Sequence, residues 1–120
     1  MSDVGGIFGY KYFVVHEWMV RILKLKGLDL LVYAVIFGLC QYGENHTYNG
    51  NNTFLMAVTG STRNGIQKSL KSLVSKEFII RHERKFKHQL IITYTINWKI
   101  IKQLTDVKQF IDSINSISNN

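Results

Sequence analysis

The spacing of apolar residues changes near Phe78 from a helical period to a strand period, and this change restricts the folds available to the chain. Before it, apolar residues recur every three or four positions, as in amphipathic helices. After it, the segments "FIIRHERKF" and "LIITYTINW" read as strands, and the second alternates every two residues between apolar and mostly polar positions. The pattern predicts several helices followed by a β-hairpin, within a length typical of one domain.

The sequence predicts some of the helices before the hairpin more clearly than others. Residues 13–23 fit either a strand or a short helix, and "KLKG" predicts that this segment stops at Gly27. Residues 28–43 are apolar most of the way round, which predicts a central buried helix. Residues 44–52 are polar and read as a loop, with a short strand around Thr47–Tyr48 as one interpretation.

Two shorter helices are expected next, each with a recognisable start. Asn51 or Asn52 is a suitable N-cap for the first, and Gly60 a suitable C-terminal stop. Ser61 then caps a helix over residues 62–76. Its apolar stripe is formed by Ile66, Leu70, Leu73 and Val74.

The hairpin link and the C-terminal tail leave alternatives open. The link "KFKHQ" contains no Gly, Pro or Asn, so the turn type cannot be assigned from sequence. Residues 98–120 have a heptad-like apolar seam, which predicts a helix that either packs on its own domain or forms a homodimer. The seam consists of Ile100, Leu104, Val107, Ile111 and Ile114, and Ile101, Phe110 and Ile117 widen it.

The charge of the chain indicates a polyanionic partner. Its net charge is +7 and its isoelectric point about 9.6, which favours nucleic acid first and an anionic membrane surface second. Residues 61–89 contain eight basic and two acidic side chains, so this segment carries +6 of the +7. The positive charge therefore concentrates on the last predicted helix and the hairpin.

This order of elements predicts a mainly α fold with a small β-hairpin, a winged helix-turn-helix with an additional C-terminal helix. In such folds one helix enters the major groove of DNA and the hairpin, or wing, contacts the backbone or minor groove. The candidate residues on the recognition helix are Ser61, Thr62, Arg63, Asn64, Gln67, Lys68 and Lys71. Those on the wing are Arg84, Lys85, Lys87 and His88.

Each candidate suits a particular contact with DNA. Arg63 can pair with guanine, and Asn64 and Gln67 with adenine, while lysines meet phosphates. The helix N-terminus at Ser61 is itself an anion site. Gly65 either lets the backbone approach DNA or has no role, and Phe86 either wedges into a minor groove or covers the hairpin.

The segment from Leu28 to Arg84 resembles the winged-helix domain of replication-initiator and replisome-organiser proteins of Firmicute phages and mobile elements. The shared features are "LLVYAVIFGLCQ", "YNG", "TGST" and "IQKSLKSLVSKEFII". The resemblance covers residues 13–97 and implies DNA binding in replication initiation. Together with the glycine-rich start and the helical spacing of the tail, this predicts three parts: a flexible arm (1–12), a winged-helix domain (13–97) and a C-terminal helix (98–120). The chain departs from the pattern at Gly65, and at Glu77, where a Gly commonly follows the Lys.

No enzymatic site is expected from the sequence. Cys40 lies in an apolar stretch and reads as a buried thiol, and the four histidines have no metal-ligand spacing. We therefore expect no cofactor, metal or small-molecule ligand. The apolar run at residues 30–40 is too short to span a bilayer and no signal peptide is recognisable, so a cytoplasmic protein is expected.

The function predicted from the sequence is sequence-specific binding of double-stranded DNA, as a transcriptional regulator or as part of a replication initiator. The alternative is a protein-interaction module that uses the apolar C-terminal helix.

Overall fold

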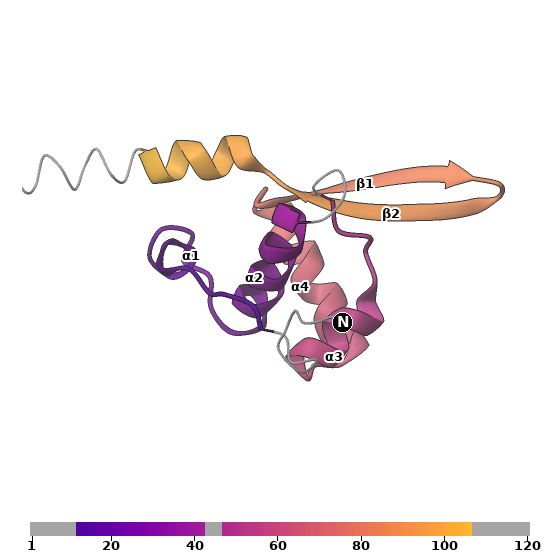
Figure 1. Ribbon diagram of the computed structural model, residues 1–120, viewed down its shortest axis with the longest axis horizontal. Coiled ribbons are helices and arrows are strands. Elements are labelled where there is room, and N and C mark those ends of the chain that lie inside the picture. The colour runs from indigo at the N-terminus through magenta and orange to yellow at the C-terminus, as the bar shows by residue number, and fades with distance from the viewer. Residues whose placement is uncertain (1–11, 43–46, 107–120) are drawn as a thin grey trace, which may run out of the picture.

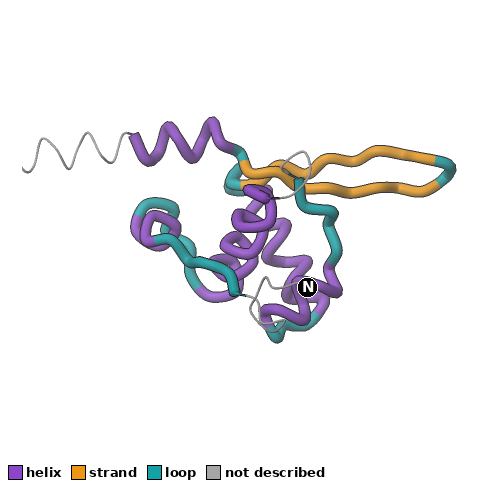
Figure 2. The backbone as a smooth tube through the Cα atoms, viewed as in Figure 1, coloured by secondary structure: helices purple, strands orange, loops and turns teal. Residues whose placement is uncertain are grey.

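The computed structural model describes residues 12–42 and 47–106, and helices precede a hairpin there as predicted (Figures 1 and 2). The helices are α1 (Glu17–Arg21), α2 (Gly27–Tyr42), α3 (Asn52–Thr59) and α4 (Arg63–Ser75). The antiparallel hairpin consists of β1 (Ile79–Phe86) and β2 (Gln89–Ile96), and residues 98–106 are helical. The hairpin projects from one side of the helical body and the last helix from the opposite side (Figure 1).

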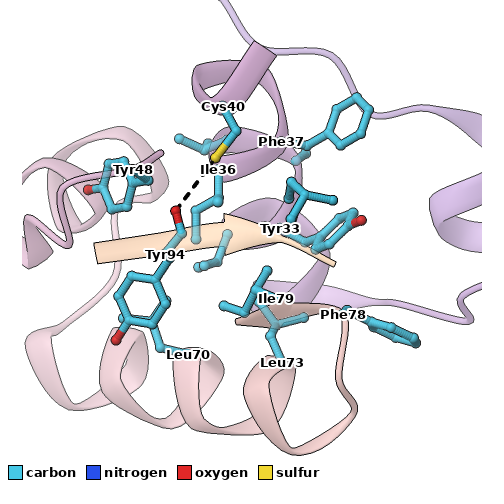
Figure 3. Close-up of a cluster of buried hydrophobic side chains, with 14 of the residues drawn as sticks. Tyr33, Ile36, Phe37, Cys40, Tyr48, Leu70, Leu73, Phe78, Ile79 and Tyr94 are labelled. Atoms are coloured by element: carbon cyan, nitrogen blue, oxygen red, sulfur yellow. Dashed lines mark hydrogen bonds between the residues drawn. The ribbon is translucent and has the colours of Figure 1, made fainter. Parts of the chain in front are cut away.

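The core forms around α2, as its apolar sequence predicts. Residues 32–37 are all buried, and α2 contacts α3, α4 and β2. Figure 3 shows Ile36 and Cys40 of α2 close to the hairpin, with Leu70 and Leu73 of α4 beneath it. Each large apolar side chain buried in this way stabilises the fold by about 1.5–3 kcal/mol.

The first helix is shorter than the predicted segment, and the expected stop at Gly27 is wrong. α1 has five residues, and the chain reverses at Lys24, whose φ is 61°. Gly27 is instead the first residue of α2. The chain returns to α1 before it reaches the glycine, because the Leu25 N–H donates to Met19 O at 3.1 Å and Leu23 and Leu25 are both buried.

The connection between α3 and α4 is a three-residue turn, in which one predicted cap is confirmed and another corrected. Asn51 caps α3 by accepting a hydrogen bond from the Phe54 N–H, and Gly60 ends it with a φ of 72°. Thr62, not Ser61, caps α4, because the Thr62 hydroxyl accepts from the Gly65 N–H at 3.1 Å. Ser61 lies one residue before the N-cap position.

Gly65 has a structural role that neither sequence interpretation included. A Cβ at this position would lie 2.6 Å from the Ser61 hydroxyl oxygen and 3.2 Å from a Leu28 methyl carbon. The missing side chain therefore allows the first turn of α4 to lie close to α2 and to the preceding turn.

Glu77 ends α4 in a conformation that glycine usually supplies. Its φ is 65°, its N–H donates to Val74 O at 2.9 Å, and the Phe78 N–H donates to Leu73 O at 3.0 Å. These two bonds form a Schellman motif, whose left-handed residue is most often Gly. The departure from the family pattern at Glu77 thus preserves the turn while placing a non-glycine residue in a strained region.

The hairpin has the two predicted strands, but the turn between them is shorter than predicted. β1 and β2 pair from Ile79 opposite Ile96 to Phe86 opposite Gln89, which leaves Lys87 and His88 as the turn. Their φ values of 50° and 69° are both positive, as a type I′ turn requires. The five-residue link expected from the sequence is therefore wrong.

Two further predictions concern the edges of the fold. Tyr48 forms an antiparallel bridge with Tyr94, in line with a short strand around Thr47–Tyr48. In the last helix, Ile101 is buried whereas Leu104, a member of the predicted seam, is 38% exposed. The predicted arm up to residue 11, and the seam members Val107, Ile111 and Ile114, lie outside the described residues.

Candidate nucleic-acid interface

One side of α4 is fixed in the core while the other is open to solvent. Its buried residues are Ile66, Ser69, Leu70 and Leu73. The helix is also tied to α2, because the Ser72 hydroxyl donates to the Asp29 carboxylate at 2.8 Å and Lys76 lies 3.6 Å from it. The predicted DNA-binding residues Thr62, Arg63, Asn64, Gln67, Lys68 and Lys71 are all exposed, and Ser61 is half-buried.

The exposed side chains of α4 form more than one row along the helix. Arg63 lies beside α3, where its guanidinium donates to the Thr53 hydroxyl at 3.5 Å. Gln67 and Lys71 follow Arg63 at intervals of four residues and so share its side of α4, and both also face the hairpin. Asn64 lies about 100° further round the helix than Arg63, so the predicted reading residues do not all share one row.

A cleft of about 580 Å³ separates α4 from the hairpin. Its lining includes buried or half-buried apolar side chains: Leu70 and Val74 on the helix, and Ile92 and Tyr94 on β2. Figure 3 shows Tyr94 reaching from β2 toward Leu70 of α4. The polar lining includes Lys71 on one side and Arg81 on the other. The cleft thus combines an apolar base with a cation on each wall.

The two faces of the hairpin differ because successive residues in a strand point to opposite sides. Ile79 is buried in the core, so Arg81, Glu83 and Lys85 share the face that turns toward α4. Arg84 and Phe86 are on the other face. The wing candidates Arg84 and Lys85 therefore point to opposite sides of the ribbon, and a ligand held on one side contacts only one of them.

Sequence reasoning did not include Arg81 among the candidate residues. It was counted only as part of the positive charge, although it pairs with Tyr94 in the register and lines the cleft. The signal was present in the sequence, since Arg81 follows Ile79 by two residues and must share its face in a strand. What was missing was the knowledge that this face lies beside α4.

The hairpin tip presents cations and an aromatic ring to solvent. Phe86 is 53% exposed, and the Lys87 ammonium lies 5.3 Å from the centre of its ring, within the range of a cation–π contact. Lys87 and His88, which form the turn, are exposed as well. The tip therefore offers a positively charged surface with one apolar side chain.

Most of the cations in this region have no counter-ion. Lys76 is paired with Asp29, and Arg81 with Glu83 on the same strand. The other six form no ion pair among residues 12–42 and 47–106: Arg63, Lys68, Lys71, Arg84, Lys85 and Lys87. An anionic partner can bind these side chains without first breaking an ion pair.

Cys40 and the histidines were the other side chains considered for chemistry. Cys40 is buried, its thiol donates to Tyr94 O at 3.8 Å, and burial raises its pKa. A protonated thiol is a poor nucleophile. His82 lies 2.9 Å from the Thr95 hydroxyl, and within the described part of the chain no three metal-ligating side chains come together. In the same residues no helix is long and apolar enough to cross a membrane.

Comparison with solved structures supports the fold. A possible transcriptional regulator from Methanosarcina mazei Go1 is similar over 82% of this chain and 80% of its own, with a TM-score of 0.53 and 18% identity. Stf76 from the Sulfolobus islandicus plasmid-virus pSSVx matches 62% of this chain and 86% of its own at 20% identity, but its TM-score of 0.41 does not establish a shared fold. No family model and no curated protein matches this chain. At this level of identity, the first likeness shows a common fold and nothing further.

Proposed function

We propose that this protein is a winged helix-turn-helix that binds double-stranded DNA, with α4 as the recognition helix and the hairpin as the wing. The observation that carries the proposal is the arrangement of α4: four core residues fix one side, and Arg63, Asn64, Gln67, Lys68 and Lys71 are exposed on the rest. A helix held in this way can present arginine and amide side chains to base edges in a fixed register. The unpaired cations of the hairpin supply phosphate contacts beside it.

The proposed domain boundaries follow the sequence analysis, with the DNA-binding unit at residues 13–97. A regulatory role is supported by the name of the Methanosarcina mazei protein of similar fold, a possible transcriptional regulator. A role in replication initiation rests on the sequence resemblance alone. If the C-terminal helix forms a homodimer, the target is a palindrome whose half-sites lie about 34–36 Å apart or a multiple of this.

A second candidate function is a protein-interaction module, and it is favoured by exposed apolar residues away from the cleft. Trp98 is 50% exposed and Leu104 38% exposed on the C-terminal helix. A separate apolar groove of about 620 Å³ lies between the N-terminal segment, α2 and α3, and includes Tyr12, Phe37 and Val58. In this case, substitution of Arg63 and Lys68 leaves partner binding unchanged.

The deciding experiment measures fluorescence anisotropy of a labelled random duplex over a salt series. We expect the logarithm of affinity to fall with the logarithm of salt concentration at about −0.9 per phosphate contacted. Arg63→Ala/Lys68→Ala should weaken binding and flatten this slope. The matched control, Lys24→Ala/Lys102→Ala, removes two exposed cations outside α4 and the hairpin. Equal effects of the two double variants, or no binding by the wild type at low salt, contradict the proposal.

A further inference from the structure

Arg81 is the one cation of the cleft that already has a partner. Its guanidinium donates to the carboxylate of Glu83, two residues along β1 and on the same face of the hairpin. The two side chains are 40% and 47% exposed, so water and solutes reach both. A guanidinium has five N–H donors and this contact uses one nitrogen, which leaves donors available to the cleft.

The opposite wall of the cleft carries a cation of a different kind. Lys71 is exposed on α4 and has no ion pair within the described residues. The base between the two cations is apolar, with Leu70, Val74 and Ile92. A phosphodiester matches this lining, because its charged oxygens can meet the two cations while the adjoining sugar contacts the apolar base.

The dimensions of DNA place a backbone strand at this position. The major groove of B-DNA is about 12 Å wide, and a helix with its side chains is about 10–12 Å across. A helix in the groove therefore has a sugar–phosphate strand along each flank. On the flank that faces the hairpin, the space beside α4 is the cleft.

We propose that the cleft holds a phosphodiester of the bound DNA between Lys71 and Arg81, and that Glu83 is the internal counter-ion which this phosphate replaces at Arg81. The inference rests on the proposed function and adds Arg81 and Glu83 to its site. An exposed ion pair contributes only about 0.2–1 kcal/mol, so a phosphate that accepts two hydrogen bonds from one guanidinium can displace the carboxylate. Glu83 then lowers the affinity for DNA, both by holding Arg81 and by repelling the phosphate.

The chain supplies a matched control for this pair. On α1, Arg21 and Glu17 form another exposed ion pair, with 2.6 Å between the charged atoms, outside α4 and the hairpin. Glu83→Gln and Glu17→Gln remove the same charge, as do Arg81→Gln and Arg21→Gln. The variants are compared by anisotropy of a labelled duplex at about 0.15 M salt, where screening acts over about 8 Å.

We expect Glu83→Gln to bind about twofold to fivefold more tightly than wild type, whereas Glu17→Gln changes affinity little. Arg81→Gln should weaken binding and reduce the salt slope by about 0.9, the value for one phosphate, and Arg21→Gln should leave the slope unchanged. In the Arg81→Gln background, the gain from Glu83→Gln should shrink, because Glu83 no longer competes for the guanidinium.

Three results would overturn the inference while leaving the proposed function intact. They are equal effects of Glu83→Gln and Glu17→Gln, an unchanged salt slope in Arg81→Gln, and an undiminished gain in the double variant. A further experiment measures the melting temperature in millimolar inorganic phosphate. If phosphate raises the melting temperature of wild type but not of Arg81→Gln, the cleft is a site for free phosphate instead. If the wild type does not bind the duplex at all, the proposed function itself is wrong.

Discussion

α4 and the hairpin both carry exposed cations, yet the rest of the molecule holds them in different ways. α4 is bonded to α2 through Ser72 and buries four of its residues. In β1 only Ile79, at the base, is buried, and every later residue of the strand is exposed. β2 is buried or half-buried from Ile91 to Ile96 and exposed only at Gln89 and Leu90. The hairpin is thus attached at its base through β2, while its tip and most of β1 are solvated.

This difference assigns different tasks to the two elements. Base reading needs donors held in a fixed geometry, because a small displacement breaks a bidentate contact. Phosphate contacts tolerate movement, since the charge of the backbone is repeated along each strand. Under the proposed function, this comparison assigns sequence specificity to α4 and assigns to the hairpin an affinity that does not depend on sequence.

The largest expected effect tests whether α4 is part of the core and the hairpin tip is not. Leu73 is fully buried, so Leu73→Ala should lower the free energy of unfolding by about 2–5 kcal/mol. Leu90 is 52% exposed near the tip, and Leu90→Ala should change it by less than about 0.5 kcal/mol. Urea denaturation followed by circular dichroism measures both. If Leu90→Ala lowers the free energy of unfolding as much as Leu73→Ala does, the tip packs against the body. The difference drawn between α4 and the hairpin is then wrong.

The next effect separates specificity from affinity, once a preferred duplex has been selected. Asn64→Ala should lower the ratio of specific to non-specific binding by the equivalent of about 1–3 kcal/mol. Lys85→Ala should weaken both kinds of binding alike and reduce the salt slope by about 0.9. Lys102→Ala is the control, since it removes an exposed cation outside α4 and the hairpin. Loss of sequence discrimination in Lys85→Ala would reverse the assignment of tasks.

The parts of the fold that were predictable are those determined by local pattern. The buried α2, the Asn51 cap, the Gly60 stop and the stripe of α4 each follow from residues a few positions apart. The errors occurred where neighbouring residues offered equivalent chemistry. Ser61 and Thr62 are equally good caps, and only the length of the turn after Gly60 selects Thr62.

The candidate site depended more on tertiary structure. The exposed side of α4 followed from its apolar stripe, but the cleft did not, because it requires two elements to lie side by side. Nor was the turn predictable, since Lys87 and His88 adopt positive φ values that usually indicate Gly or Asn. Without the turn, the register was unknown, and so were the residues of β2 that lie opposite Arg81, Arg84 and Lys85.

The corrected cap provides a smaller test within α4. Thr62→Ala removes the acceptor of the Gly65 N–H and should cost about 1 kcal/mol of stability. Ser61→Ala should change stability by less than about 0.5 kcal/mol, because Ser61 does not cap the helix. Thermal unfolding of the two variants checks this. If Ser61→Ala loses more stability than Thr62→Ala, Ser61 is the N-cap of α4, as the sequence first suggested.

The smallest effects come from two strained positions, one in each element. Glu77 ends α4 and His88 lies in the hairpin turn, with φ values of 65° and 69°. Glycine should relieve about 1–2 kcal/mol of strain at either position and lose about 0.5–1 kcal/mol in chain entropy, a net gain below about 1.5 kcal/mol. The gain should appear differently in the two variants. Glu77→Gly should raise the global free energy of unfolding, because α4 ends in the core.

His88→Gly should instead slow amide exchange along β1 and β2 with little change in global stability, because the tip of a solvated hairpin opens locally. Glu77→Ala is the control for charge: it removes a carboxylate from a helix C-terminus but keeps a side chain at positive φ. If Glu77→Ala is as stable as Glu77→Gly, the gain comes from charge and not from strain. If His88→Gly raises global stability as much as Glu77→Gly, the hairpin unfolds together with the core. The hairpin would then be as firmly held as α4, and its cations could read sequence as well as supply affinity.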